Sequence, residues 1–287
     1  MVVSANKETG LGHWYRCSAL LSVAFNRGHK TALVGDRKPS NSTRFYSSAY
    51  LNEDSFVKAC ESFQPNWIVI DIPDKIPDWM WQTSAKKCVI DGIGHETKEK
   101  AELNISQGFD GEYCAPVYLI LRQHMMISPA LPKPREGMFV FGGGADKLGL
   151  AKRFVQSCKE IPANIVISPM VDWIEVALSQ IHTLYTMDDN HVFSVMKAST
   201  GAAAHMGMIC WELCRDNIAP HIFSYSVGHL ESAKELERRG YALAYDMIGL
   251  PENDETLLDF LNRPAVFNGQ PIDGWGAERV IRLMERK

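Results

Sequence analysis

The strongest constraint on the fold is a glycine turn that leads directly into a helix, GLGHWYR at Gly10–Arg16. A short apolar stretch precedes it at 1–3, apolar residues at helical spacing follow over 17–25, and a second apolar run spans 30–35. This order of strand, turn, helix and strand predicts the start of a doubly wound parallel sheet. Ligands of such sheets bind at the carboxyl ends of the strands, which is where this turn falls.

The residues of the turn suit a general base beside a bound ligand. Gly10 and Gly12 let the backbone come close to a ligand, and the start of the helix offers free N–H groups and a partial positive charge. That charge favours a neutral imidazole on His13, the form that accepts a proton. A histidine that only caps the turn is the simpler alternative. The dinucleotide-binding fingerprint is excluded, because Tyr15 stands where its third glycine belongs.

Composition narrows the class of protein. The chain of 287 residues is long enough for two domains, and its formal net charge of −4 gives no support for bulk binding to nucleic acid. No apolar run reaches the roughly 18 residues of a membrane span. Met1 leads into an apolar strand rather than a signal peptide, and the seven cysteines are scattered without a Cys-x-x-Cys pair. We therefore expect a cytoplasmic protein with reduced thiols and neither a metal site nor a cofactor.

The middle of the chain repeats the opening arrangement. A proline-rich segment at 129–136 is the best candidate for a linker. After it, 138–141 has the pattern of a strand, Gly142, Gly143 and Gly144 form a glycine loop, and 148–159 has the pattern of a helix. Two such units predict two similar α/β domains.

We place these domains at 1–132 and 137–287, with the last helix at 277–285 as a candidate to pack back on the first domain. The residues 198–201 fit either a strand or a turn. Other expected strands lie at 66–71, 87–92, 164–168 and 221–225, and other expected helices at 53–63, 171–181, 190–197, 206–214, 228–240 and 257–261. The alternation of the two types is typical of an α/β protein.

Two acids, Asp71 and Asp91, end apolar runs that have the pattern of buried parallel strands. Strand ends of a parallel sheet share one edge, so both side chains should lie near the expected ligand site. A helix cap or a role in loop structure is the simpler interpretation of each.

Several short motifs follow one another from end to end of the chain. They are GLGHWYRC at 10–17, YLILR at 118–122, FGG with Asp146 at 141–146, WE at 211–212, the segment 233–240, and DGWGAERV at 273–280. In this order they resemble the UDP-sugar hydrolase of pseudaminic acid biosynthesis and its spore-coat polysaccharide relatives. That family is related to the lipid II-forming N-acetylglucosaminyltransferase, and the resemblance implies a GT-B-type fold, two Rossmann-type domains that face an interdomain cleft.

The resemblance also implies a function in polysaccharide biosynthesis. In a UDP-sugar hydrolase, His13 would activate water to displace UDP from the anomeric carbon with inversion. In an inverting GT-B glycosyltransferase, the same base would deprotonate an acceptor hydroxyl on a glycan, a small molecule or a modified nucleic acid. A sugar-nucleotide-binding protein without activity is a third alternative. Hydrolysis is the first hypothesis, and the sugar, the acceptor and the oligomeric state stay open.

Under the same resemblance, the donor binds mainly to the second domain and needs no metal. The diphosphate would bind the glycine loop at 142–144 and Gly207, and Glu212 would accept hydrogen bonds from the ribose hydroxyls. Further candidates to contact the sugar nucleotide lie within the motifs or close to them in the sequence. They are Gly10, Gly12, Arg16 and His229, with Asp91 and Glu96 as candidates to orient His13 or contact the sugar. Arg16 and His229 have structural alternatives, an ion pair with an acid and a helix cap.

The sequence departs from the family pattern near the expected sugar and phosphate groups. Ser4-Ala5-Asn6 stands where the family has an Asp before its first glycine loop. His205–Ile209 replaces the family's A-G-G-S-T and keeps one glycine, and Gly228-His229 replaces Asn-Gln. These departures weaken the hydrolase hypothesis relative to transfer.

Overall fold

A computed structural model describes residues 1–3, 12–35, 46–48, 52–72, 75–91, 99–122, 135–144, 146–168, 180–186, 189–248 and 256–287. Gly10, Glu96, Ser4-Ala5-Asn6, most of the expected linker and most of the expected helix at 171–181 lie outside the described residues, and 180–181 form a turn.

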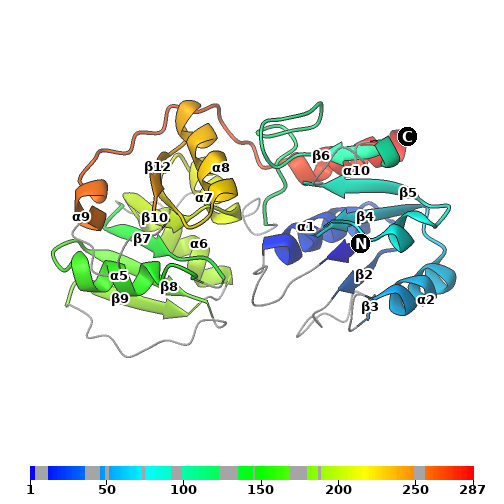
Figure 1. Ribbon diagram of the computed structural model, residues 1–287, viewed down its shortest axis with the longest axis horizontal. Coiled ribbons are helices and arrows are strands. Elements are labelled where there is room, and N and C mark those ends of the chain that lie inside the picture. Colours follow the sequence, from blue (N-terminus) through cyan, green and yellow to red (C-terminus); the bar gives the residue numbers. More distant parts are fainter. Residues whose placement is uncertain are drawn as a thin grey trace. The chain divides into compact units, whose positions relative to one another are not determined.

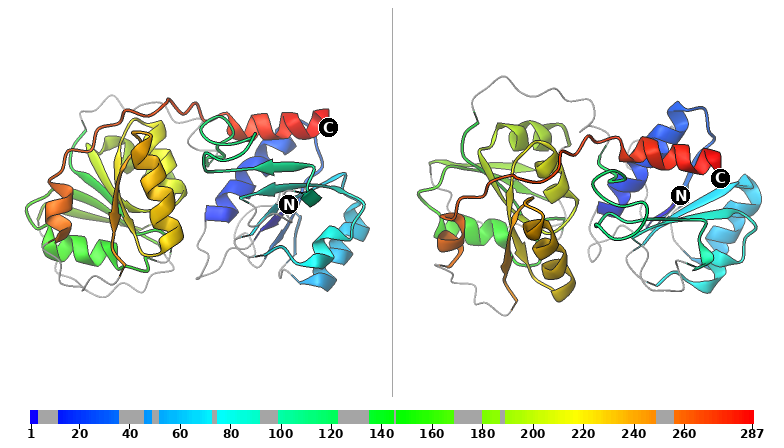
Figure 2. Two further views of the ribbon diagram at one scale, coloured as in Figure 1. Left: turned by 45° about the horizontal axis from the view of Figure 1, so that its top comes forward. Right: turned by 90° about the horizontal axis from the view of Figure 1, so that it is seen from above.

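The chain divides into two compact units (Figure 1). The first consists of Met1–Met126 together with Asp273–Lys287, and the second of Ile127–Ile272. The C-terminal helix α10 (Gly276–Arg286) is therefore part of the first unit, where it packs against α1 (Gly12–Asn26) (Figure 2).

The first unit contains a six-stranded parallel sheet in the order β3-β2-β1-β4-β5-β6. Its strands are β1 (Val2–Val3), β2 (Ala32–Gly35), β3 (Tyr46–Ser48), β4 (Trp67–Asp71), β5 (Lys86–Ile90) and β6 (Leu103–Ile105). Helices α1 and α10 pack on one face, and α2 (Glu53–Phe63) and the 3₁₀ helix η1 (Asp78–Trp81) pack on the other. Burial on both faces explains why β4 and β5 are continuous apolar runs rather than alternating ones.

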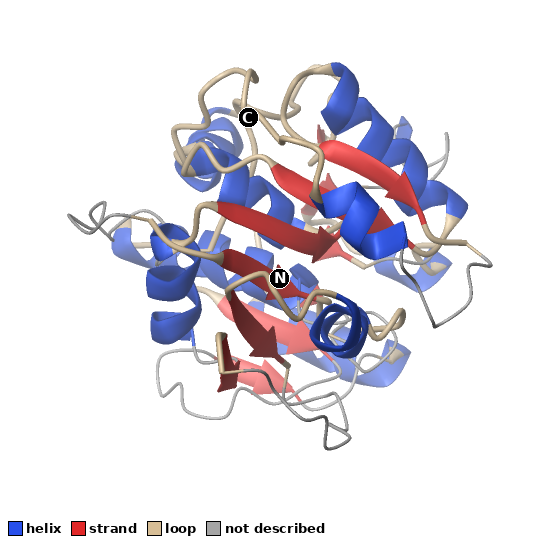
Figure 3. Ribbon diagram, turned by 90° about the vertical axis from the view of Figure 1, so that its left-hand side faces the viewer, coloured by secondary structure: helices blue, strands red, loops and turns tan. Residues whose placement is uncertain are grey.

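The second unit repeats this topology in the order β12-β11-β10-β7-β8-β9, again all parallel. Its strands are β7 (Met138–Phe141), β8 (Ala163–Ile167), β9 (His182–Thr186), β10 (Gly201–His205), β11 (Pro220–Ser224) and β12 (Leu243–Asp246). Its helices are α5 (Leu150–Ser157), α6 (Asp189–Ala198), α7 (Met208–Arg215), α8 (Val227–Arg238) and α9 (Thr256–Leu261), and Figure 3 shows helices on both sides of the strands.

The motif DGWGAERV serves to attach α10. Asp273 accepts hydrogen bonds from the backbone N–H of Trp275 and from the side chain of Arg279. At Gly276 a Cβ atom would collide with the backbone of Leu119, so only glycine lets the helix start so close to that segment of the first unit. The motif therefore has a structural role in the described residues.

None of the described helices is both long enough and apolar enough to cross a membrane. All seven cysteines lie within the described residues and are free thiols.

Candidate functional site

In the first unit, a histidine and an arginine on one helix meet an aspartate at the end of the neighbouring strand. His13 and Arg16 lie in the first turn of α1, and Asp71 is the last residue of β4. His13 Nδ1 lies 2.6 Å from Asp71 Oδ1. Arg16 donates from Nε and Nη2 to the two oxygens of the same carboxylate, at 2.8 and 2.6 Å. Asp71 is fully buried and the His13 side chain is 21% exposed. The imidazole is therefore accessible to a ligand, while the carboxylate that it contacts is not.

The distances determine which ring nitrogen of His13 carries the proton. A contact of 2.6 Å between Nδ1 and Asp71 needs a hydrogen atom in between, since an ionised carboxylate only accepts. Nδ1 is therefore the donor, and in the neutral ring the lone pair lies on Nε2. Arg16 Nη2, 3.0 Å from Nδ1, is a close neighbour and not a bonding partner, because both groups are donors. This tautomer is the one that a general base needs.

Arg16 connects the histidine to a second acid. Its Nη1 donates to Asp91 Oδ2 at 2.7 Å, and Asp91 Oδ1 accepts from the backbone N–H of Gln107 at 2.6 Å. Arg16 is thus bound to carboxylates through all three of its nitrogens, which is the structural alternative expected for it. Among the described residues, Asp91 forms an ion pair with Arg16 and no hydrogen bond with His13, so it acts on the histidine through the arginine.

Charge and burial oppose each other at Asp71. Burial alone would raise the pKa of Asp71, but the Arg16 charge and the hydrogen bonds from His13 and Arg16 lower that pKa below its ordinary value of 3.8. Burial also opposes the charge of Arg16, while Asp71 and Asp91 raise the pKa of that guanidinium. Removing one partner of a buried ion pair typically costs about 3–5 kcal/mol.

In the second unit, the glycine loop after β7 folds around an aspartate. A Cβ atom at Gly142 would collide with the carboxylate of Asp146, and Gly143 adopts a left-handed φ of 82°. Asp146 accepts from the backbone N–H groups of Leu150 at 2.7 Å and Ala151 at 3.2 Å. The first N–H groups of α5 are therefore already satisfied by an anion, which disfavours a phosphate there.

The start of α7 differs, because no side chain caps it and its N-cap residue Gly207 is exposed. His205, the last residue of β10, lies just before it with its ring buried. Its Nε2 has no hydrogen-bond partner among the described residues and lies 3.8 Å from Asp146 Oδ1. Burial lowers the pKa of His205 to about 3, so the ring is neutral at pH 7. Open N–H groups and a buried polar nitrogen together suit an anionic ligand.

The start of α8 adds a cluster of rings after β11. Tyr225 lies between His205 and His229, with ring centroids 5.4 and 4.7 Å apart, and the Lys147 ammonium lies 5.6 Å from the Tyr225 ring. His229 Nδ1 is 2.8 Å from the hydroxyl of Ser226, the N-cap residue of α8. Burial lowers the pKa of His229 as well.

Comparisons with known proteins bear on the fold. No protein-family model matches the chain, and no curated protein is detectably similar to it. Among solved structures, MurG of Acinetobacter baumannii aligns with 100% of this chain and 99% of its own at 11% identity, with a TM-score of 0.65. The spinosyn rhamnosyltransferase SpnG complexed with thymidine diphosphate covers 99% of this chain and 94% of its own at 10% identity, with a TM-score of 0.67.

The chain has the GT-B fold. A putative UDP-N-acetylglucosamine 2-epimerase of Listeria monocytogenes is also similar, over 99% of this chain and 94% of its own at 9% identity, with a TM-score of 0.59. The fold expected from the motifs is thus confirmed.

Within each unit of this GT-B fold, the predicted site residues lie at the carboxyl edge of the sheet. The first unit brings together His13, Arg16 and Asp91, and Gly12 is the first residue of α1. In the second unit, Gly142, Gly143 and Gly144 follow β7, Gly207 precedes α7 and His229 lies in the first turn of α8. Of the described residues, no three His, Cys, Asp or Glu side chains are placed to hold a metal ion.

Glu212 lies differently from what a ribose contact requires. It is fully buried in α7, between the buried Trp211 and Leu213. The structure does not offer its carboxylate to a ligand, so its ribose role stays a prediction.

Sequence reasoning left the roles of two residues of the candidate site unassigned. Asp71 was expected near the ligand site from its position at the end of a buried apolar strand, with a cap or loop role as the simpler interpretation. It was not assigned to His13, whose Nδ1 it binds. His205 was noted only as a departure from a family motif, and its signal was a histidine between a strand of small residues and the glycine that opens a helix.

Proposed function

We propose that this protein is an inverting GT-B glycosyltransferase that uses a nucleoside-diphosphate sugar, with UDP as the first candidate nucleotide. The observation that carries the proposal is the 2.6 Å hydrogen bond between His13 and the buried Asp71. It leaves Nε2 of a partly exposed imidazole free to accept a proton, as a general base requires. The full-length similarity to GT-B structures supports this class of reaction.

In the proposed reaction, an acceptor hydroxyl gives its proton to His13 Nε2 while its oxygen attacks the anomeric carbon of the donor. The bond between that carbon and the diphosphate oxygen breaks, and the nucleoside diphosphate leaves with the electron pair. Asp71 stabilises the imidazolium that forms, and Arg16 keeps Asp71 ionised and in place. A single displacement of this kind inverts the anomeric configuration.

The second unit would hold the leaving diphosphate. Its open α7 N-terminus offers backbone N–H groups, and His205 stands two residues before the N-cap residue Gly207, with no hydrogen-bond partner for its Nε2 atom among the described residues. A neutral imidazole can donate a hydrogen bond to a phosphate when its proton is on the nitrogen that faces the ligand. Donors of this kind stabilise the charge that develops on the leaving group without a metal ion.

Transfer takes precedence over the hydrolysis expected from the resemblance. The similar structures named above are two enzymes of the GT-B type and an epimerase, and they give the hydrolase no support. SpnG was solved with thymidine diphosphate, so a thymidine nucleotide is a sensible comparison for the donor.

The decisive test is to incubate the purified protein with a panel of UDP- and TDP-sugars, with and without pools of hydroxyl acceptors. Release of the nucleotide that depends on an acceptor, with an inverted glycoside as product, is the expected result. Rapid release with free sugar as the only product would instead favour the hydrolase. If the protein neither binds these sugars nor releases a nucleotide from them, both the transferase and the hydrolase are overturned.

A further inference from the structure

Trp275, the N-cap residue of α10, is an exposed aromatic residue of the first unit. It is 55% exposed, whereas every other tryptophan in the described part of the chain is buried or half-buried. An apolar group that a protein leaves in water, with polar groups around it, often marks a binding surface. The neighbours of this ring and its place at the edge of the sheet indicate what it binds.

One arginine fixes the main chain around Trp275. Arg279 Nη1 donates to the carbonyl of Val117 and to Asp273 Oδ1, each at 2.9 Å. The backbone N–H of Trp275 donates to the same Asp273 oxygen at 2.9 Å. Val117 is itself 49% exposed. Two apolar side chains and one ion pair therefore share this part of the surface, on a backbone that these hydrogen bonds hold in place.

Trp275 lies at the same edge of the sheet as His13. Helix α10 packs on the face that α1 covers, and Lys287 directly after it donates to the carbonyl of Glu102, the residue before β6. The end of α10 is therefore at the amino edge of the sheet, and its start is at the carboxyl edge. His13 stands at that same edge, in the first turn of α1.

A short buried segment connects Trp275 with the surroundings of the proposed base. Gly276, next to Trp275, packs so closely on Leu119 that a Cβ atom would collide with its backbone. Three residues after Leu119, the Arg122 guanidinium lies 5.1 Å from the ring of Tyr15, which stands two residues after the base. Three residues of chain span at most about 11 Å. One extended ligand can thus contact both places, with different parts of it at each.

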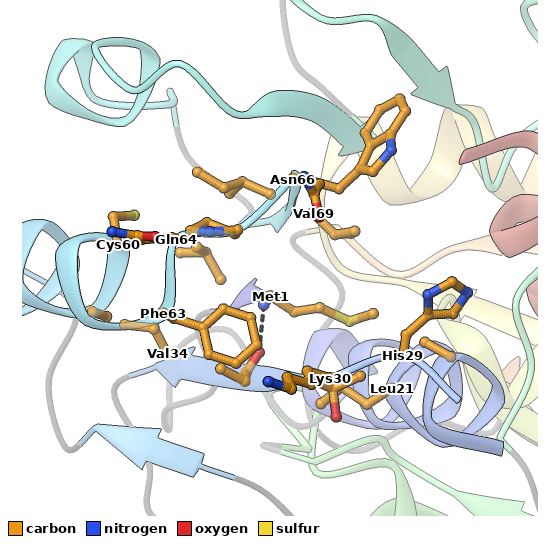
Figure 4. A pocket seen from close by; sticks show the side chains of 18 of the residues that line it. Met1, Leu21, His29, Lys30, Val34, Cys60, Phe63, Gln64, Asn66 and Val69 are labelled. Atoms are coloured by element: carbon orange, nitrogen blue, oxygen red, sulfur yellow. Dashed lines mark hydrogen bonds between the residues drawn. The ribbon is translucent and has the colours of Figure 1, made fainter. Parts of the chain in front are cut away.

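A cavity of about 760 Å³ in the first unit lies at the other edge (Figure 4). Its lining includes Ala32 and Trp67, the first residues of β2 and β4, and the neighbouring Asn66. A ligand in this cavity is at the amino ends of the strands, away from His13. An acceptor that gives its proton to His13 binds instead at the carboxyl edge, where Trp275 is exposed.

The groups around the Trp275 ring fit a neutral sugar. The face of an indole stacks on the C–H groups of a pyranose ring, and ionised side chains bind the hydroxyl groups of the same sugar. The side chain of Asp273 is 48% exposed and that of Arg279 is 34% exposed, so both are accessible to such hydroxyl groups. The two charges cancel, so this pair gives an anionic polymer or lipid surface no attraction.

We propose, on the basis of the transfer reaction proposed for His13, that Trp275 binds the acceptor by stacking on a sugar ring of an oligosaccharide whose reacting hydroxyl lies at His13. Asp273 and Arg279 bind the hydroxyl groups of the stacked sugar. Among possible acceptors, this selects neutral glycans of more than one sugar unit. Trp275 takes no part in the bond that forms, because it holds a more distant part of the acceptor.

Binding is measured first, without a donor. The probes are neutral tetrasaccharides of glucose, N-acetylglucosamine, galactose, mannose and rhamnose, each with its monosaccharide. Saturation-transfer NMR and calorimetry should detect binding of at least one tetrasaccharide, and Trp275→Ala should weaken this binding about tenfold. Trp275→Tyr keeps a flat ring and should retain most of the affinity. Phe25→Ala is the matched control, since Phe25 is an exposed aromatic residue near the other end of α1.

Transfer is measured second, with a donor and the tetrasaccharide that binds. Trp275→Ala should raise the KM for this acceptor about tenfold, while kcat and the KM for the donor stay within about twofold. The KM for the corresponding monosaccharide should not change, because a single sugar at His13 does not extend to Trp275.

The proposal is overturned if no tetrasaccharide binds, or if Trp275→Ala binds them as well as the unchanged protein does. It is also overturned if Trp275→Ala loses binding only to vesicles of phosphatidylglycerol and phosphatidylethanolamine, because the ring then contacts a membrane. Transfer with an unchanged acceptor KM in Trp275→Ala removes the sugar contact and leaves the transferase intact. Tetrasaccharide binding that depends on Trp275, without any turnover of nucleotide sugars, removes the transferase and supports the sugar contact.

Discussion

At the carboxyl ends of its strands, the first unit gathers charged side chains, whereas the second gathers neutral rings and backbone N–H groups. In the first, two aspartates hold Arg16 and one of them also holds His13. In the second, Asp146 is turned into the cap of α5, and burial keeps His205 neutral. Both sheets have the same strand order, so the difference lies in the residues that follow each strand.

This difference fits a division of labour. A general base needs a fixed tautomer and a nearby anion for the cation that it becomes, which the first unit supplies. A leaving diphosphate needs hydrogen-bond donors, and in the proposed reaction the uncapped start of α7 would supply them. The predictions that follow separate the two roles, from the largest expected effect to the smallest.

Replacing the base should give the largest effect. We expect His13→Ala to lower turnover by about 10²–10⁴-fold while UDP affinity, measured by calorimetry, stays within about twofold. His29→Ala is the matched control, since His29 bonds Glu285 at the surface of the same unit. A His13→Ala variant with full activity would end the assignment of His13 as the base.

Asp71→Asn should lower turnover by about 10²-fold, because the amide no longer fixes the tautomer of His13 or stabilises its charged form. It should also destabilise the first unit by about 3–5 kcal/mol, since Arg16 loses its main partner in a buried site. Glu285→Gln is the control, because that carboxylate also pairs with an arginine, Arg27, but at the surface. Urea unfolding that shows equal losses for the two variants would contradict the buried network as the source of stability.

His205→Gln should weaken UDP binding by about tenfold, which corresponds to the loss of roughly one hydrogen bond to a charged group. Binding of uridine, which has no phosphate, should stay unchanged, and calorimetry with both ligands distinguishes the cases. If uridine binding weakens as much as UDP binding, His205 does not act on the diphosphate.

Acid should destabilise the second unit before the first. The pKa of His205 is lowered to about 3 and that of His221 to about 4, from an ordinary value of 6.5. Below pH 6.5 the unfolded chain takes up protons that the folded second unit does not, so its stability falls as the pH falls toward these values. The pKa of Asp71 is lowered below 3.8, so its stabilising contribution is present above that value and is lost only at lower pH.

Scanning calorimetry between pH 7 and pH 4.5 should therefore show that, as the pH falls, the Tm of the second unit decreases before that of the first unit. His205→Gln should reduce this acid sensitivity. If the Tm of the His205→Gln variant depends on pH as that of the unchanged protein does, these histidines do not control the difference in acid stability between the units. The same conclusion follows if the first unit loses stability at a higher pH than the second.

Local signals in the sequence predicted many elements well. The helix expected at 53–63 is α2, because Asn52 and Ser55 form a capping box and Phe56 is placed to face the core. The strand expected at 66–71 is β4, because a continuous apolar run is a local signal as well. In contrast, the sequence predicted only a strand or turn at 198–201 where the structure has β10 at Gly201–His205. Its residues 202–204 are alanines with little strand preference, and only burial between two neighbouring strands makes them a central strand.

The sequence by itself determined the two parallel sheets, the glycine turns and the place of His13 at the start of a helix, because these follow from local patterns of apolar residues and glycines. Only the tertiary structure decided which acid serves that histidine. Asp71 lies 58 residues from His13, and Asp91 lies 75 residues from Arg16. Two neighbouring strands and one helix bring these groups together, and the order of the strands is set by packing across the whole sheet rather than by any local pattern.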